Sequence, residues 1–149
     1  ARFIPNRENS GSPFIQWNRG AREARGRYLW IAESDDSCAP EMIQRLVDQL
    51  EAQPDAGIAY AQSMLVDEQS RELHSYEENL RFIYKSQAWQ QDFCVDGREA
   101  CRKWLFFHNP IPNASGLLLR RKSFLEAGLA DPRMRLNGAG ATLLRGATP

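Results

Sequence analysis

The sequence predicts an α/β fold in which helices flank a mostly parallel sheet. Short runs rich in aromatic and branched residues, typical of buried strands, occur at 28–32, 58–66 and 114–119. An amphipathic helical pattern precedes the first run, and a second one separates the first run from the next. A helix of this length between buried strands indicates a crossover connection, which brings the two strands into a parallel arrangement.

The N-terminal part predicts a short strand followed by a helix. Phe3 and Ile4 form an apolar pair ahead of a loop-forming stretch. Ser12 is a suitable N-cap with Pro13 at the first helical position, and Gly26 closes the segment. Apolar residues recur three or four apart between these limits, at Phe14, Trp17, Ala21 and Ala24. We therefore expect an amphipathic helix of about three turns.

Later segments predict three more helices and a change of character at the end. Pro40 begins a helix with an apolar stripe, and Asp96 can cap another that carries Ala100, Cys101, Trp104 and Leu105. Between them the pattern loosens at 67–109, with aromatic residues that show no clear period. A last helix opens with Arg120, Arg121 and Lys122 and is closed by Gly128, a suitable C-cap. Residues 136–149 are rich in Gly, Ala and Thr, so we expect a poorly ordered tail.

Composition excludes several classes of protein. The chain of 149 residues carries 19 basic and 19 acidic residues, so no net field attracts it to nucleic acid or to an anionic membrane. Three cysteines form an odd set without close spacing, and the two histidines stand alone, which argues against disulfides and structural zinc and favours a reducing compartment. No apolar run is long enough to span a membrane.

The most informative stretch is the acidic cluster after the first buried run, at Glu33, Asp35 and Asp36. Side chains two apart on an extended segment point the same way, so Glu33 and Asp35 can converge on one hard cation. Alternatively, these acids only solvate a turn, or Asp36 and Ser37 bond the loop backbone before the next helix. The carboxyl end of a parallel strand is a common ligand site, which favours the first interpretation.

Several short motifs follow one another in a distinctive order. They are Asn9-Ser10-Gly11, then Asn18, Gly20, Ala24 and Gly26, then YLWIAESDD with Pro40, and later NPIPNASGLLLRRKSFLEAGLADPRM. Their order and spacing resemble the central portion of a family 2 glycosyltransferase of the GT-A fold. The resemblance implies an incomplete GT-A domain, Rossmann-like and of the nucleotide-diphospho-sugar transferase type, over residues 1–135, with the disrupted tail at 136–149. It also implies that N-terminal strands for the nucleotide base and a C-terminal catalytic segment are missing.

In that family, an acidic motif holds a divalent cation that bridges the donor diphosphate. The resemblance places Glu33 and Asp35 at its outer positions as ligands of Mn²⁺ or Mg²⁺, although Glu replaces the usual first Asp. Asp35, Asp36 and Asn18 are then expected to bind the donor diphosphate or ribose. The general base is expected downstream, where this sequence has no carboxylate after Asp131, so no catalytic residue is predicted and the chain alone is expected to be inactive.

The resemblance thus implies an inverting, metal-dependent transfer of a sugar from a nucleotide-sugar donor to an acceptor hydroxyl, in the synthesis of cell-surface polysaccharide or another glycan. The expected acceptor is a saccharide or a lipid-linked one. The expected location is the cytoplasm, including the inner face of the membrane. Two alternatives stay open: a nucleotidyltransferase acting on sugar phosphates, which normally has a Gly-rich phosphate loop, and a non-catalytic truncated binding domain.

Overall fold

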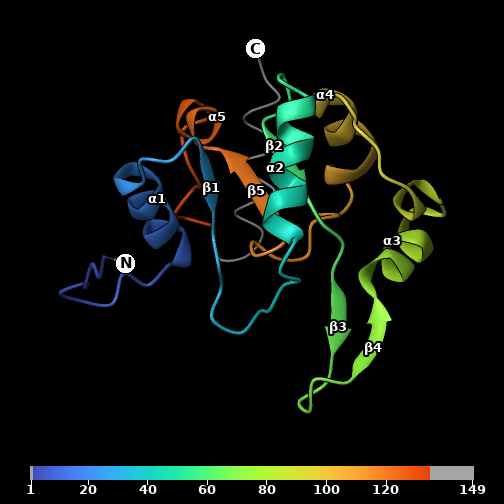
Figure 1. The fold of residues 1–149 in the computed structure, drawn as a ribbon, viewed down its shortest axis with the longest axis horizontal. Helices are drawn as coiled ribbons and strands as arrows, with labels where there is room; N and C mark the ends of the chain where they lie inside the picture. Colours follow the sequence, from blue (N-terminus) through green and yellow to red (C-terminus); the bar gives the residue numbers. More distant parts are fainter. Residues whose placement is uncertain (1, 135–149) are drawn as a thin grey trace.

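The computed structural model describes residues 2–134 and shows an α/β fold (Figure 1). Its strands are β1 (Tyr28–Trp30), β2 (Ile58–Tyr60), β3 (Met64–Val66), β4 (Glu72–Ser75) and β5 (Leu117–Arg120). Its helices are α1 (Pro13–Glu23), α2 (Met42–Ala52), α3 (Tyr76–Tyr84), α4 (Gly97–Ala100) and α5 (Arg121–Glu126), with a 3-10 turn η1 (Ala88–Gln90) and a π-helical turn η2 (Cys101–Leu105). The predicted fold class is confirmed at this level.

The central sheet has three strands in the order β1-β5-β2, and β5 is antiparallel to both neighbours. Strands β1 and β2 therefore run in the same direction, as their α2 connection predicts. However, no two strands within residues 2–134 pair in parallel, so the expected mostly parallel sheet is not what these residues form. The reason is that β5 returns from the long 61–116 excursion in the opposite direction and inserts between the other two strands.

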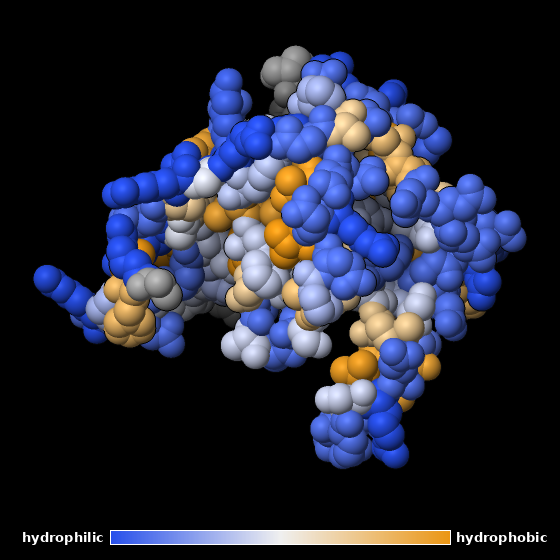
Figure 2. All heavy atoms as spheres, viewed as in Figure 1, coloured by the Kyte–Doolittle hydropathy of each residue, from blue (hydrophilic) through white to orange (hydrophobic). Residues whose placement is uncertain are grey.

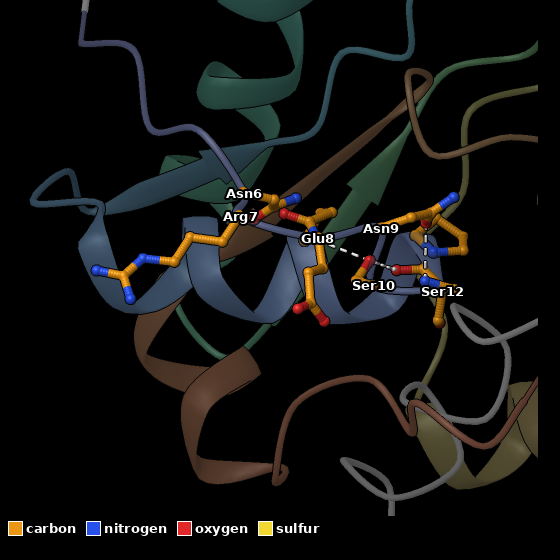
Figure 3. A pocket seen from close by; sticks show the side chains of 9 residues that line it. Asn6, Arg7, Glu8, Asn9, Ser10 and Ser12 are labelled. Atoms are coloured by element: carbon orange, nitrogen blue, oxygen red, sulfur yellow. Dashed lines mark hydrogen bonds between the residues drawn. The ribbon is translucent and has the colours of Figure 1, made fainter.

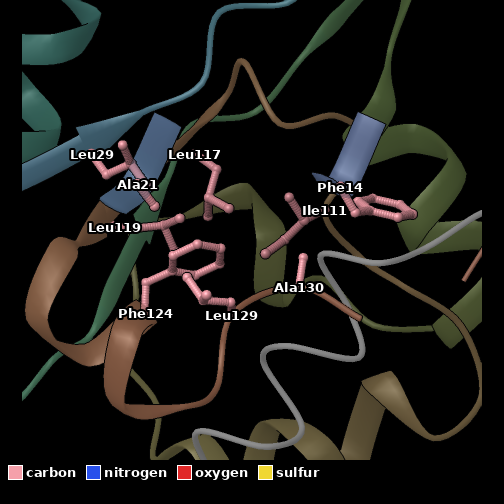
Figure 4. Close-up of a cluster of buried hydrophobic side chains, with 9 residues drawn as sticks. All are labelled: Phe14, Ala21, Leu29, Ile111, Leu117, Leu119, Phe124, Leu129 and Ala130. Atoms are coloured by element: carbon pink, nitrogen blue, oxygen red, sulfur yellow. The ribbon is translucent and has the colours of Figure 1, made fainter. Parts of the chain in front are cut away.

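Strand β5 is buried on both faces because helices cover both sides of the sheet. Leu117 and Leu119 belong to a core cluster that includes residues of α1 and α5, as Figure 4 shows. Leu118 points the other way and packs with Leu46 and Leu50 of α2. This alternation explains the uninterrupted apolar run at the start of β5, since a strand between two helical layers needs apolar side chains on both faces.

Two of the predicted helix limits are confirmed. The Ser12 hydroxyl accepts a hydrogen bond from the Phe14 amide, and Pro13 is the first residue of α1. Gly128 has a φ of +87° just beyond α5, a conformation that glycine adopts without strain. The second helix begins at Met42, two residues after the expected Pro40.

The predicted strand at 58–66 is two separate strands. Strand β2 pairs with β5 in the central sheet. Strand β3 pairs with β4 instead, in a hairpin that projects from the body of the molecule (Figure 1). Asp67 closes the hairpin loop, because its carboxylate accepts hydrogen bonds from the amides of Gln69 and Arg71. Met64 and Leu73 of this hairpin are exposed. Figure 2 shows apolar surface on the projecting hairpin.

The rest of the excursion forms a second aromatic core. Trp89 stacks on Tyr84 and lies within 6.3 Å, centroid to centroid, of Phe93 and within 5.0 Å of Trp104. The helix expected after Asp96 is confirmed, and its second half is the π-helical turn η2. The expected strand at Phe3 and Ile4 is wrong, since these residues pair with no strand of the described part of the chain, residues 2–134. The predicted tail at 136–149 lies outside the described residues.

Candidate functional site

The acidic cluster lies on a tight turn at the end of β1. Strand β1 ends at Trp30, and the Asp36 amide donates a 3.4 Å hydrogen bond to the Glu33 carbonyl oxygen. Ser34 and Asp35 occupy the two central positions of this turn. The prediction of converging side chains assumed an extended segment, whereas these residues form a turn. We call residues 33–36 the acidic turn.

The three carboxylates of the acidic turn are uncommitted. Glu33 is half-buried, whereas Asp35 and Asp36 are exposed. None of their carboxylate oxygens forms a salt bridge or hydrogen bond with residues 2–134. In the same part of the chain, no group of three or more His, Cys, Asp or Glu side chains converges into a complete metal site. Any cation held here must therefore take further oxygen ligands from a bound molecule or from water.

Ser115 anchors the segment that leads into the acidic turn. Its hydroxyl accepts a 2.9 Å hydrogen bond from the Glu33 amide, and its carbonyl oxygen accepts a 2.8 Å bond from the Trp30 indole Nε1. Ser115 is only 5% exposed, so its side of both bonds is buried. The sequence places this serine in the expected strand at 114–119, and no local pattern indicates its contact with a residue 82 positions away.

A cavity of about 590 Å³ opens beside the acidic turn. One wall comes from α1, through Gln16, Trp17 and Gly20, and the opposite wall comes from residues 29–35. Gly20 leaves open space, because a Cβ atom at this position would meet no atom within 4 Å. Aromatic and carboxylate side chains thus border one hollow, a combination suited to a ligand with both a flat ring and charged groups.

A second cavity, of about 710 Å³, lies at the start of α1 and is lined by the loop at residues 6–12. Figure 3 shows Ser10 and Ser12 there, joined by a hydrogen bond from the Ser10 hydroxyl to the Ser12 carbonyl oxygen. Asn9 shapes the loop by accepting a bond from the amide of Gly11, which has a φ of +70°. Gln16 borders both cavities, so the two hollows are neighbours along α1.

Asn18 is buried in the core and does not line either cavity. Its side-chain amide donates to the Ala130 carbonyl oxygen at 2.8 Å, and its carbonyl oxygen accepts from the Ala130 amide at 3.0 Å. This pair of bonds fastens α1 to the segment after α5. A donor contact through Asn18 would have to share or replace these bonds, whereas Asp35 and Asp36 are free to bind.

A comparison with models of protein families identifies the family of this chain. The model of the family described as glycosyl transferase family 2 matches residues 1–127 of the 149-residue chain. The chain belongs to glycosyl transferase family 2. A comparison with curated proteins gives no match.

Membership of glycosyl transferase family 2 confirms the predicted resemblance, and at family level it supports a glycosyltransferase with a nucleotide-sugar donor and a glycan acceptor. Membership implies the GT-A fold. Residues 2–134 have the α/β character of that fold, but their sheets are antiparallel. Within the same residues, no helix is long and apolar enough to cross a bilayer.

Proposed function

We propose that this family 2 glycosyltransferase transfers a sugar from a nucleoside-diphosphate donor to an acceptor hydroxyl with inversion, in the synthesis of a cell-surface polysaccharide or a related glycan. The acidic turn carries the proposal, because it presents uncommitted carboxylates at the wall of a cavity. Glu33 and Asp35 are proposed to hold Mg²⁺ or Mn²⁺, and Asp36 to assist at the metal or the ribose. The donor is proposed to lie in the cavity between Trp17 and Trp30.

The chemistry of these residues fits a hard divalent cation. Carboxylate oxygens are the ligands that Mg²⁺ and Mn²⁺ prefer, and such ions are usually held by one or two carboxylates together with substrate phosphates. An incomplete protein site is therefore what a metal shared with a diphosphate requires. When bound, the cation neutralises the charge that develops on the leaving nucleoside diphosphate. A general base is assigned to none of the described residues.

The proposal is tested by calorimetric titration of the 149-residue chain with UDP, GDP, ADP and dTDP, with and without Mn²⁺. We expect Mn²⁺ to strengthen the binding of at least one of them. Asp35→Ala should weaken that Mn²⁺-dependent binding at least about tenfold, as losses around a metal site typically do. Asp55→Ala is the matched control, because Asp55 is also an exposed carboxylate and lies in the turn after α2.

Equal affinity of Asp35→Ala and the unchanged chain would contradict the proposed metal role. The reaction type has its own measurement. Glycosyl transfer releases a nucleoside diphosphate from a nucleotide sugar, whereas a nucleotidyltransferase releases pyrophosphate from a nucleoside triphosphate and a sugar phosphate. Pyrophosphate release would therefore replace the proposed reaction with the alternative one.

A further inference from the structure

The turn that contains Ser115 is built more rigidly than a connection between elements requires. The Leu117 amide donates to the Ala114 carbonyl oxygen, and the Asn113 side-chain oxygen accepts from the Gly116 amide at 2.8 Å. Asn113 also donates to the Ser63 hydroxyl at 3.2 Å. A Cβ atom on Gly116 would lie 3.1 Å from the Asn113 side-chain oxygen and 3.2 Å from the Ala61 carbonyl oxygen, so a larger residue would require these atoms to shift by a few tenths of an ångström.

This rigid turn faces the acidic turn, and Ser115 is the point of contact. Its carbonyl oxygen holds the Trp30 indole, and its hydroxyl holds the Glu33 amide, so one buried residue fixes both ends of the Trp30–Glu33 segment. Trp30 and Glu33 both line the cavity of about 590 Å³. A group that is held by a buried neighbour with several hydrogen bonds of its own already has its binding geometry. It therefore loses less conformational entropy when a ligand binds.

We propose that Ser115 is a positioning residue, whose hydroxyl holds the acidic turn in the orientation that receives the metal-bound diphosphate. This inference rests on the proposed function and extends it to a residue without a charge. Ser115 itself does not border the cavity. It acts through the Glu33 backbone, and its loss should therefore weaken metal-dependent binding while leaving every carboxylate in place.

The variant Ser115→Ala separates the two contacts of this residue. It removes the hydroxyl that bonds Glu33 and keeps the carbonyl oxygen that bonds Trp30. In NMR spectra of the unliganded chain, we expect faster hydrogen exchange at the Glu33 amide and an unchanged Trp30 indole resonance. If the resonance of the Trp30 indole also shifts, the whole turn at 113–116 has moved, and the assignment to the hydroxyl is overturned.

The matched control is Ser75→Ala. The Ser75 hydroxyl accepts a 3.1 Å hydrogen bond from the Glu77 amide, so this substitution removes the same kind of bond at the start of α3, outside both cavities. We expect Ser115→Ala to weaken Mn²⁺-dependent binding of the tightest nucleoside diphosphate about threefold to tenfold, the effect of losing one ordering hydrogen bond. Its binding without Mn²⁺, and both affinities of Ser75→Ala, should match the unchanged chain.

The outcomes distinguish this inference from the function on which it rests. If Asp35→Ala loses Mn²⁺-dependent binding but Ser115→Ala binds as tightly as the unchanged chain, the positioning role is overturned and the proposed function stands. If the unchanged chain binds no nucleoside diphosphate with Mn²⁺, the proposed function and the positioning role are both overturned. A loss in Ser75→Ala equal to that in Ser115→Ala would also overturn the positioning role, because the effect would then be general.

Discussion

Arg120 Nε donates a 2.7 Å hydrogen bond to the carbonyl oxygen of Ala56, which lies 64 positions earlier in the chain. The same guanidinium donates to the carbonyl oxygens of Leu50 and Gln53 at the end of α2, and its carbon lies 5.6 Å from the centre of the Tyr28 ring. Arg121 does the same for α1, by donating to the Ala21 carbonyl oxygen at 2.8 Å. Two adjacent arginines, the last residue of β5 and the first of α5, therefore cap the two helices on opposite faces of the sheet.

Replacing Arg120 with methionine should destabilise the chain by about 3 kcal/mol. The substitution keeps an unbranched side chain of similar length but leaves the carbonyl oxygens of Leu50 and Ala56 without their charged donor. The free energy of unfolding in urea measures the loss. Arg25→Met, at an exposed position after α1, is the control and should stay within about 0.5 kcal/mol of the unchanged chain. A loss below about 1 kcal/mol in Arg120→Met would contradict the capping role.

The variant Asn18→Ala should lose about 2–3 kcal/mol of stability. It removes both hydrogen bonds to Ala130 and leaves a buried amide and carbonyl of the backbone unsatisfied. Thermal unfolding without nucleotide measures this structural effect separately from any donor contact. Gln44→Ala, which removes an exposed amide from α2, should change the free energy of unfolding by less than about 0.5 kcal/mol. Equal melting temperatures of the two variants would show that the Ala130 contact contributes nothing.

Stability should fall in alkaline solution because of two half-buried tyrosines, Tyr60 and Tyr84. Burial raises the pKa of Tyr60 from 10.0 to about 12, and its hydroxyl accepts a 2.7 Å bond from the Trp89 indole. Between these two pH values the unfolded chain has lost this proton and the folded chain has kept it. The free energy of unfolding therefore falls by up to about 1.4 kcal/mol per pH unit above pH 10, and the contribution levels off above about 12.

Tyr60→Phe tests this pH dependence. Urea unfolding between pH 9 and 11 should show a shallower alkaline fall in the variant, although its stability is lower throughout because the Trp89 indole loses its acceptor. Burial also raises the pKa of Tyr84 to about 12, so part of the slope should remain. An identical slope in the variant and the unchanged chain would mean that Tyr60 ionises normally in the folded state.

The double substitution Phe106→Ser and Phe107→Ser should leave stability unchanged and improve solubility. These rings contact each other edge to face but are 80% and 74% exposed, so they contribute little burial. We expect a change in unfolding free energy within about 0.5 kcal/mol and less aggregation by light scattering. Trp89→Ala, at a ring that is 5% exposed, should instead cost about 3–5 kcal/mol. A comparable loss in the double variant would show that the phenylalanine pair is covered in solution.

Local features were predictable from the sequence, and long-range ones were not. The start of α1 depends on Ser12 and Pro13, and the acidic turn was located because its carboxylates are adjacent in sequence. The place of β5 between two other strands depends on pairing across more than 50 residues, for which hydrophobic periodicity carries no signal. For the same reason Ser115 was missed, because its partners Trp30 and Glu33 lie 85 and 82 positions away.

The separation of Ser115 from the acidic turn has a consequence for how the protein is made. A ribosome synthesises the chain from its N-terminus, so Glu33 emerges 82 residues before the serine that holds it. Likewise, the carbonyl oxygens in the last turns of α1 and α2 gain their hydrogen bonds only after Arg121 and Arg120 have been synthesised. The nascent chain therefore carries the carboxylates of the acidic turn without this hydrogen bond until residue 115 has been synthesised.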